Sequence, residues 1–393
     1  MQDMHTARPY RIGISGSYGG LNLGDEAILQ SIVAQLKRSL PVELTVFSRD
    51  ADDTFKRHRG LERVVPVRDL GRNEVVPEVE RLDLLVLGGG GILYDAEAHL
   101  YLREVELALD RSIPVMVYAI GVGPLTTPEA KRRVRDCLSR VDVLTVREVG
   151  ARKVLEEIGV KREIVVTADP AFLLEPEPVP PGMLEREGFD PQRRLIGMSV
   201  REPGSAAPDI AEDKYHALLA NAADYMVERY DADIVLVPME PRMLDVQHCH
   251  AVIAQMLWAK RATVLRGDYT SAQLLSLVGR FAFVVGMRLH FLLFAALQNV
   301  PFVALPYAAK VEGFLADMKL VMPPLHRVNA GRLLAHIDQY WDRRDGLIES
   351  NRLALAPLKQ RARQTHELLL QMLKERTARR PAVPHRDERD ARA

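Results

Sequence analysis

The sequence predicts an α/β protein in which two doubly wound parallel sheets face a cleft. Apolar strand-like runs alternate with helix-like patterns along both halves of the chain, which is typical of parallel sheets with crossover helices. A proline-dense segment at 175–182 separates the two halves. At 393 residues, the chain also exceeds the length that one hydrophobic core usually supports.

The first half begins with a strand, a loop and a helix. Residues 11–15 are apolar enough for a buried strand, and 16–24 are rich in Gly, Ser and Asn. Residues 25–36 combine helical apolar spacing with acids in the first turn. The first domain is therefore predicted to be Rossmann-like over 10–175, after an N-terminal extension at 1–9. Its later strands are expected at 43–48, 83–87, 114–119, 141–146 and 163–166.

A linker at 176–193 is expected to join the two domains, because its prolines cannot continue a helix or a central strand. The alternation then restarts and predicts a second Rossmann-like domain over 194–375. The charged residues 376–393 carry little apolar content and predict a disordered tail. In the second domain, strands are expected at 195–200, 233–237, 263–265, 281–285 and 301–305, and helices up to about 230, at about 242–258 and 270–279, and from about 329.

The composition excludes several classes of protein. Lys and Arg together number 53, as do Asp and Glu, so no basic field indicates a nucleic-acid partner. Two cysteines suit a reducing compartment and are too few for a disulfide framework. The first residues show no apolar core of a signal peptide, and polar residues interrupt the apolar region 281–309. We therefore expect a cytoplasmic protein with at most peripheral contact at the inner membrane face.

The second domain carries the most informative candidate site. Arg288 and His290 follow the predicted strand 281–285, and Lys310 comes twenty residues after His290. Arg201 follows another predicted strand. Ligands of open α/β sheets bind at the carboxyl ends of strands, Arg suits carboxylate and phosphate groups, and His exchanges protons near neutral pH. The pattern favours a small anionic substrate that is held and protonated; the alternative is a solvated Arg and a packed His.

The first domain offers an acidic and glycine-rich counterpart. Asp25 opens a helix after the glycine-rich loop, where it would repel a phosphate, so we interpret it as a base or a ligand of an acceptor hydroxyl. The alternative is a simple N-cap. The four glycines at 88–91 indicate a backbone surface that a ligand approaches closely, or else a tight turn. Arg147 follows a predicted strand, where a salt-bridged Arg is the alternative reading.

A metal site at His248, Cys249 and His250 is not expected. Their spacing matches no usual zinc pattern, and adjacent side chains on a helix point apart. We therefore expect neither a metal nor a cofactor.

These features together resemble the polysaccharide pyruvyl transferase family over about residues 10–325. The likeness is greatest to the bacterial branch that pyruvylates an amino sugar in secondary cell-wall polymers, the modification that S-layer proteins recognise. The resemblance implies a glycosyltransferase-B-like fold with the acceptor on the first domain and the donor on the second. The matching motifs are Leu21-Asn-Leu-Gly-Asp-Glu26, Gly88–Gly91, Thr145-Val-Arg-Glu148, Ala168-Asp-Pro170, Ser199-Val-Arg201, Gly286-Met-Arg-Leu-His290 and Tyr307-Ala-Ala-Lys310.

The resemblance implies that the chain transfers the pyruvyl group of phosphoenolpyruvate (PEP) to two sugar hydroxyls. The product is a cyclic ketal and phosphate is released. N-acetylmannosamine is the implied sugar, while a lipid-diphosphate carrier and the oligomeric state are left open. His290 is interpreted as the acid and Asp25 as the base, two roles that could be exchanged. The residues implied to bind PEP are Arg201, Arg288, Leu289 and Lys310. Lys310 would also neutralise the leaving phosphate, and Arg147 would position the acceptor or its diphosphate. The residues implied on the acceptor-side loops are Asn22, Gly24, Gly89 and Gly90.

Two other functions fit the same residues less well. A glycosyltransferase that uses a nucleotide sugar would often place a carboxylate at a strand end of the second domain to hold the ribose, whereas this chain has Arg288 and His290 there. A non-catalytic module that binds an anionic glycan would have no need of His290 together with Asp25.

Overall fold

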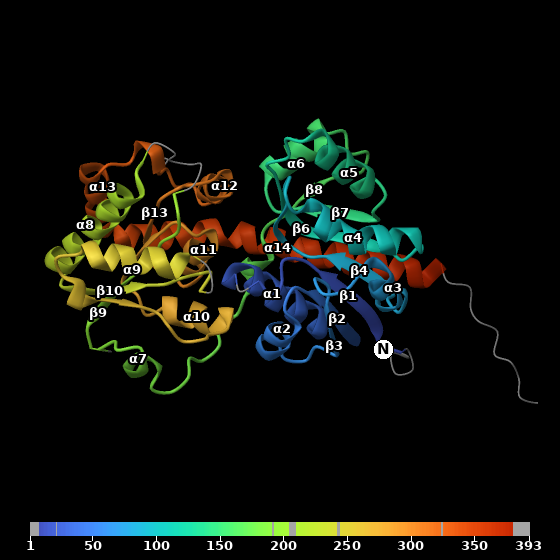
Figure 1. The fold of residues 1–393 in the computed structure, drawn as a ribbon, viewed down its shortest axis with the longest axis horizontal. Helices are drawn as coiled ribbons and strands as arrows, with labels where there is room; N and C mark the ends of the chain where they lie inside the picture. Colours follow the sequence, from blue (N-terminus) through green and yellow to red (C-terminus); the bar gives the residue numbers. More distant parts are fainter. Residues whose placement is uncertain are drawn as a thin grey trace, which may run out of the picture.

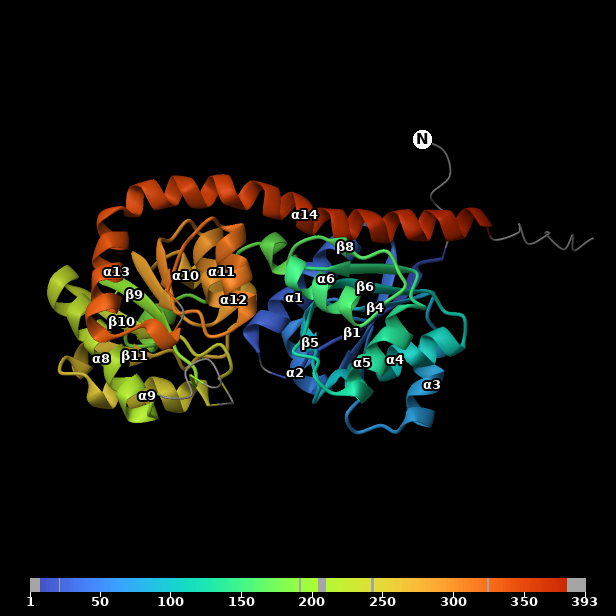
Figure 2. The ribbon, with the colours of Figure 1, turned by 90° about the horizontal axis from the view of Figure 1, so that it is seen from above.

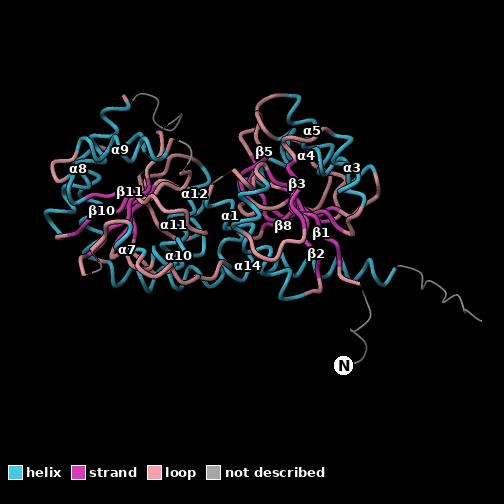
Figure 3. Tube along the Cα trace, turned by 60° about the horizontal axis from the view of Figure 1, so that its bottom comes forward, coloured by secondary structure: helices cyan, strands magenta, loops and turns pink. Residues whose placement is uncertain are grey.

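The computed structural model describes residues 8–379, apart from 21, 191, 204–209, 242–243 and 324. It consists of two lobes, each with a parallel sheet at its centre and helices around it (Figures 1 and 3). The predicted α/β architecture is confirmed. Most of the predicted N-terminal extension, 1–7, and most of the predicted tail, 380–393, lie outside the described residues.

The first lobe holds an eight-stranded sheet in the order β3-β2-β1-β4-β6-β7-β8, with β5 paired to β6. All of its recorded pairings are parallel. The sequence reading missed β3 and β5, and β5 converts part of the expected glycine turn into a strand. The strands are β1 Tyr10–Ser15, β2 Val42–Ser48, β3 Arg63–Pro66, β4 Leu84–Leu87, β5 Gly90–Leu93, β6 Val115–Val122, β7 Val143–Val146 and β8 Val165–Val166.

The helices of the first lobe follow the strands in the expected alternation. Side chains at N-cap positions define several of their starts; Thr127, for example, accepts a hydrogen bond from the backbone of Ala130 at the start of α5. The helices are α1 Leu23–Ser39, α2 Ala51–Arg57, α3 Arg72–Glu80, α4 Ala98–Asp110, α5 Pro128–Leu138, α6 Val149–Glu157 and the 3-10 turn η1 Pro170–Leu173.

The segment between the lobes packs on the second lobe. It contains the short helix α7, Met183–Arg186, which the proline content had not suggested. The carboxylate of Glu187 accepts hydrogen bonds from the backbone of Arg266 and Gly267 and from the hydroxyl of Tyr269. This contact anchors the end of the segment before the second sheet begins.

The second lobe holds a five-stranded parallel sheet in the order β11-β10-β9-β12-β13. Its apolar strands are buried, as expected for a sheet that helices cover on both faces. The strands are β9 Arg194–Ser199, β10 Ala232–Leu236, β11 Ala262–Val264, β12 Phe283–Gly286 and β13 Phe302–Ala304. The helices are α8 Glu212–Tyr230, α9 Asp245–Gln255, α10 Ser271–Val278, α11 Leu289–Leu297, α12 Ala309–Asp317 and α13 Ala330–Asp342, with 3-10 turns at Ala259–Arg261 and Leu325–Arg327.

The last helix joins the two lobes. Helix α14, Arg344–Arg379, runs along one side of both (Figure 2). Its Thr365 hydroxyl lies 2.7 Å from that of Thr167, and His366 bonds to Ser39, both in the first lobe. The C-terminal residues therefore contribute to both lobes. None of the described helices is long and apolar enough to cross a membrane.

Direct contacts between the lobes position the site. The start of α1 is held by two backbone contacts: the amide of Leu23 donates to Met239, and its carbonyl accepts from Ser271. One hydrophobic core is continuous across the interface and includes Ile28 and Phe291. Full burial of a side chain of this size stabilises a protein by about 1.5–3 kcal/mol. The loop after β1 is thereby held against the loops that follow β10 and β12.

Candidate functional site

The first lobe presents Asp25 at the start of α1. The side chain of Asn22 caps this helix by accepting hydrogen bonds from the backbone of Gly24 and Asp25. Gly90 lies opposite with φ of 103°, and a Cβ on it would come within 3.1 Å of the Asp25 carboxylate. The glycine therefore provides a conformation and a space that other residues would not. The N-cap alternative fails for Asp25, because the capping side chain is that of Asn22.

The second lobe brings His290 to the same place. His290 lies in the first turn of α11, just after β12 ends, and its side chain is 11% exposed. Its ring rests against Gly24, where an added methyl group would collide with the imidazole. Residues that are 265 positions apart in the sequence, Asp25 and His290, thus meet between the lobes. The absence of a side chain at Gly24 is what permits the approach.

A carboxylate that has no role of its own among the sequence predictions, that of Asp169, supports His290. Asp169 Oδ2 lies 3.4 Å from His290 Nε2 and accepts a 2.9 Å hydrogen bond from Arg147. Its other oxygen accepts from the backbone of Ala171. Burial raises the pKa of Asp169, but the charges and hydrogen bonds of His290 and Arg147 outweigh it, so the net pKa is well below its usual range. Asp169 is therefore an anion that faces the His290 ring.

Arg147 is committed to this network. Its guanidinium bonds to Asp169 and to Glu148 at 2.7 Å, and its side chain is only 4% exposed. Burial lowers the pKa of Arg147, yet the two carboxylates more than compensate and hold it above its usual value. Arg147 therefore exposes little surface for the expected contact with an acceptor. Its place beside Asp169 makes it a positioning residue for His290.

Arg288 is also less free than the sequence suggested. Its Nε donates to Asp245 at 3.0 Å, and its Nη2 donates to Asp245 and to Glu240. Glu240 in turn accepts a 2.7 Å hydrogen bond from the side chain of Asn22 in the first lobe. Burial lowers the pKa of Arg288, but Asp245 and Glu240 raise it further. Among the described residues, Nη1 of Arg288 has no hydrogen-bond partner, so this nitrogen is the one left for an anion.

Tyr307 is at the centre of the cationic part of the site, and the sequence analysis gave it no role of its own. The guanidinium of Arg201 lies 4.3 Å from the ring centroid and the Lys310 ammonium 5.6 Å from it. Burial raises the pKa of Tyr307, but the charges of Lys310, Arg201 and Arg288 lower it more, so the net pKa falls below 10. A half-buried phenol that is more acidic than usual indicates a local positive potential that suits an anionic ligand.

The electrostatics join the two halves of the site at Asp25. Burial raises the pKa of this half-buried carboxyl to about 6, although the charges of His290 and Lys310 oppose the shift. These interactions place Lys310 within electrostatic range of Asp25. The structure thus brings together Asp25, His290 and Lys310 in one acid–base cluster.

The remaining predicted residues serve the packing. The side chain of Leu289 is buried in the shared core, which leaves only its backbone for a ligand. A Cβ on Gly89 would meet Ile28, the carbonyl of Ala119 and Pro170. Gly89 therefore permits close packing of α1 and η1 on the sheet, and it is Gly90 that faces Asp25.

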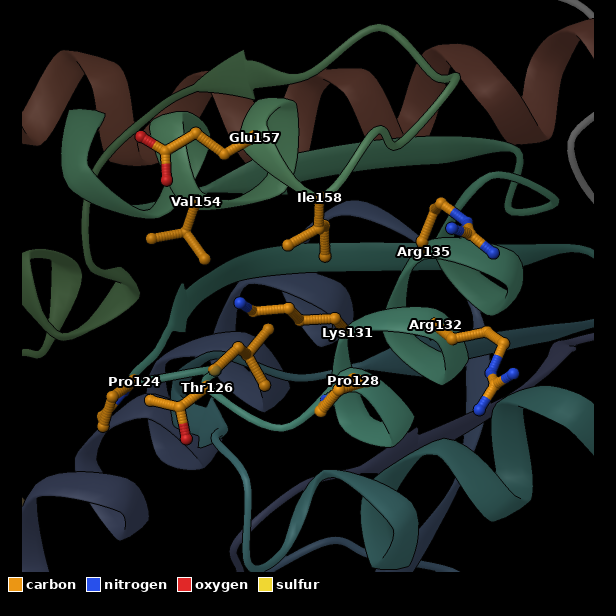
Figure 4. Close-up of a pocket in the computed structure, with 10 residues that line it drawn as sticks. Pro124, Thr126, Pro128, Lys131, Arg132, Arg135, Val154, Glu157 and Ile158 are labelled. Atoms are coloured by element: carbon orange, nitrogen blue, oxygen red, sulfur yellow. The ribbon is translucent and has the colours of Figure 1, made fainter.

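A separate cavity of about 530 Å³ lies between α5 and α6 (Figure 4). The cationic side chains Lys131, Arg132 and Arg135 line it together with the acidic Glu157 and apolar residues such as Val154. Lys131 and Arg132 have no ion-pair partner within the described part of the chain and are exposed. None of the predicted site residues lines this cavity, so it is distinct from the cluster between the lobes.

Comparisons with known proteins agree with the predicted family and fold. A model of the polysaccharide pyruvyl transferase family matches residues 22–308. The amylovoran biosynthesis protein AmsJ of Erwinia amylovora is 22% identical over 313 residues, which cover 76% of this chain and 74% of AmsJ.

Solved structures share the two-lobed architecture. The UDP-GlcNAc 2-epimerase of Neisseria meningitidis aligns with a TM-score of 0.62 at 10% identity, over 92% of this chain and 100% of the epimerase. The ADP-heptose heptosyltransferase II of E. coli aligns with a TM-score of 0.53 at 14% identity, over 86% and 99%. At such identities the likeness establishes the glycosyltransferase-B-like fold and does not extend to the reaction.

Proposed function

The chain belongs to the polysaccharide pyruvyl transferase family, and from this premise we propose that it transfers the pyruvyl group of PEP to two hydroxyls of one sugar. The product is a cyclic ketal and the leaving group is phosphate. The observation that carries the proposal is the meeting of Asp25 and His290 beside the cations Arg201 and Lys310. A reaction that protonates one partner, deprotonates the other and expels phosphate needs these groups together.

In the proposed mechanism, His290 gives a proton to the vinyl carbon of PEP, which becomes the methyl group. Asp25 takes the proton of the first sugar hydroxyl as its oxygen bonds to the central carbon. The bond from this carbon to the phosphate oxygen then breaks, and the second hydroxyl oxygen takes its place. Of the two hydroxyl protons, one replaces the proton that His290 gave to the methyl carbon, and the other leaves with phosphate.

The environments of the two groups support this assignment of acid and base. The carboxylate of Asp169 lies 3.4 Å from Nε2 of His290 and fixes the orientation of the ring. With a pKa of about 6, Asp25 is ionised at neutral pH and is a stronger base than an ordinary aspartate. The opposite assignment would require Asp25 to hold its proton above this pKa, so the pH dependence of the reaction distinguishes the two.

Arg201 and Lys310 are the proposed direct ligands of PEP. Both lie close to the ring of Tyr307, and two neighbouring cations suit a ligand that carries both a carboxylate and a phosphate. Arg288 contributes through its remaining nitrogen, while its other contacts with Asp245 and Glu240 hold it at the end of β12. Lys310 also neutralises the phosphate as it leaves.

We propose that the acceptor is an N-acetylmannosamine-containing glycan of a cell-wall polymer that S-layer proteins recognise, carried on a lipid diphosphate at the inner face of the membrane. The resemblance of the motifs to that bacterial branch supports the sugar. Outside the cluster between the lobes, Lys131, Arg132 and Arg135 outnumber Glu157 in the cavity between α5 and α6, and this excess of positive charge supports an anionic carrier such as a diphosphate. Replacement of Lys131 and Arg132 by Glu should raise the KM for a lipid-linked acceptor and leave that for a free disaccharide unchanged.

The decisive experiment measures phosphate release from PEP, with and without a panel of N-acetylmannosamine-containing acceptors. Acceptor-dependent release, together with a ketal detected by mass spectrometry or NMR, would establish the reaction. An absence of release with every acceptor, combined with tight binding of a nucleotide sugar, would replace the proposal with a glycosyltransferase activity. Binding of PEP or glycan without turnover would indicate a non-catalytic module.

A further inference from the structure

A second cluster of chemically active side chains lies outside the proposed active site, between α8 and α9. His216 Nε2 lies 2.9 Å from His248 Nδ1. Glu212, one turn before His216 on α8, places a carboxylate oxygen 3.5 Å from His248 Nδ1 and 4.0 Å from His216 Nε2. Both imidazoles are buried, whereas the carboxylate is 66% exposed. Three potential ligand atoms therefore lie close together, two from the buried histidines and one from the exposed Glu212.

We propose that Glu212, His216 and His248 bind one divalent transition-metal ion of the zinc class. All three ligand atoms lie within 4.8 Å of one another. Two imidazoles and one carboxylate suit Zn²⁺ and its first-row neighbours, whereas Ca²⁺ and Mg²⁺ prefer sites made of oxygen atoms. The proposed reaction with PEP does not involve this ion.

The geometry requires only small adjustments. Zinc lies about 2.0–2.2 Å from nitrogen and oxygen ligands, so the ligand atoms of a tetrahedral site are roughly 3.3–3.5 Å apart. The Glu212–His248 distance of 3.5 Å already fits. The two histidine nitrogens would separate by a few tenths of an ångström, and the exposed Glu212 side chain is free to move toward His216. A fourth position would remain open to water on the exposed side.

The electronic state of the histidines agrees with this role. Burial lowers the pKa of both His216 and His248, with their mutual proximity adding to the effect at His216. Neutral imidazoles keep the lone pairs that a metal ion needs. Binding of the ion would therefore displace little more than the proton in the hydrogen bond between His216 and His248.

The expectation that His248 lies in no metal site rested on its neighbours in the sequence. His250, on the same helix, is exposed and is not one of the converging ligands. The partners of His248 come instead from α8, more than thirty residues earlier in the chain. Glu212 and His216 have the i, i+4 spacing that places two ligands on one helical face, but a metal site becomes visible only once α9 packs beside them.

The proposed metal site lies outside the proposed PEP site but is connected to two of its residues, Arg288 and Arg201. His248 follows Asp245 by one helical turn, and Asp245 holds the guanidinium of Arg288. Tyr215, adjacent to His216, donates a 2.8 Å hydrogen bond to the backbone of Arg201. An ion that ties α8 to α9 would therefore restrain the segments that carry two of the proposed PEP ligands.

The test uses the full-length chain without a polyhistidine tag, stripped of metal by a chelator that is then removed. Co²⁺ is added and followed by visible absorption, and Zn²⁺ binding is measured by calorimetry. The wild type should bind one equivalent with the absorption of a low-coordinate nitrogen–oxygen site. Glu212→Gln alters an exposed side chain, so the protein should still fold, and it should bind roughly tenfold more weakly or worse.

His248→Asn should abolish binding, and His250→Ala, on the same helix, should bind like the wild type. Thermal unfolding with Zn²⁺ should occur at a higher temperature in the wild type and in His250→Ala but be unshifted in His248→Asn. No saturable binding by the wild type would overturn the proposal and leave a hydrogen-bonded histidine pair. Equal affinity of the wild type and Glu212→Gln would likewise remove Glu212 from the site.

Discussion

Replacement of Asp25 by Asn tests whether the ionised carboxylate of Asp25 destabilises the folded protein. Burial raises the pKa of Asp25 from 3.8 to about 6. One pKa unit corresponds to about 1.36 kcal/mol, so the ionised side chain should destabilise the folded state by up to about 3 kcal/mol. The value is an upper bound, because the side chain is only half-buried and solvent screens part of the effect.

The sign of the pH dependence follows from the direction of the shift. Because the pKa of Asp25 is higher in the folded than in the unfolded protein, the folded protein binds this proton more tightly. Its contribution to stability is greatest below pH 3.8, falls as the pH rises toward 6 and stays low above that. Asp25→Asn should therefore be more stable than the wild type at pH 8, and the difference should shrink as the pH falls toward 4.

Asp169→Asn provides a matched control in the same site, because the pKa of Asp169 is shifted in the opposite direction. This variant should be less stable than the wild type by nearly the same amount at pH 8 and at pH 4, because the contribution of a carboxylate with a lowered pKa is lost only as the pH falls below its unfolded value of 3.8. The free energy of unfolding is measured in urea by far-UV circular dichroism at both pH values. Loss of stability in Asp25→Asn at pH 8, or a gain that is the same at pH 4, would refute the reasoning. Turnover should be lost in Asp25→Asn while PEP still binds.

Three further changes test other contacts of the site. His290→Ala should lower kcat by about 10²–10⁴ while PEP affinity changes much less, and equal losses in both would exclude the proton-transfer role. Gly24→Ala should displace the His290 ring and lower kcat at least tenfold, whereas Gly20→Ala, where an added methyl would meet nothing closer than 3.6 Å, should behave like the wild type. Asp245→Asn should cost about 3–5 kcal/mol in urea unfolding because it leaves Arg288 buried without its main partner, and an unchanged midpoint would show that Glu240 suffices.

Much of the fold and part of the site follow from the sequence itself. The periodicity of apolar residues determined the alternation of strands and helices, since strands buried on both faces and amphipathic helices each have their own spacing. It also placed Arg288 and His290 directly after a strand and Asp25 at the start of a helix, as observed. The short strands β3 and β5 were missed because so few residues carry too little periodicity.

Only the tertiary structure decided which of these side chains act together. In the sequence Asp169 is only one residue of a family motif, yet in the structure it faces His290 because η1 and α11 pack against each other across the lobes. Arg288 looked like a free cation until α9 brought Asp245 to it, and His248 gained His216 in the same way. Local patterns encode which face of an element is buried. The approach of Gly24 to His290 depends instead on how two sheets are placed relative to each other, and that is set by the shared core as a whole.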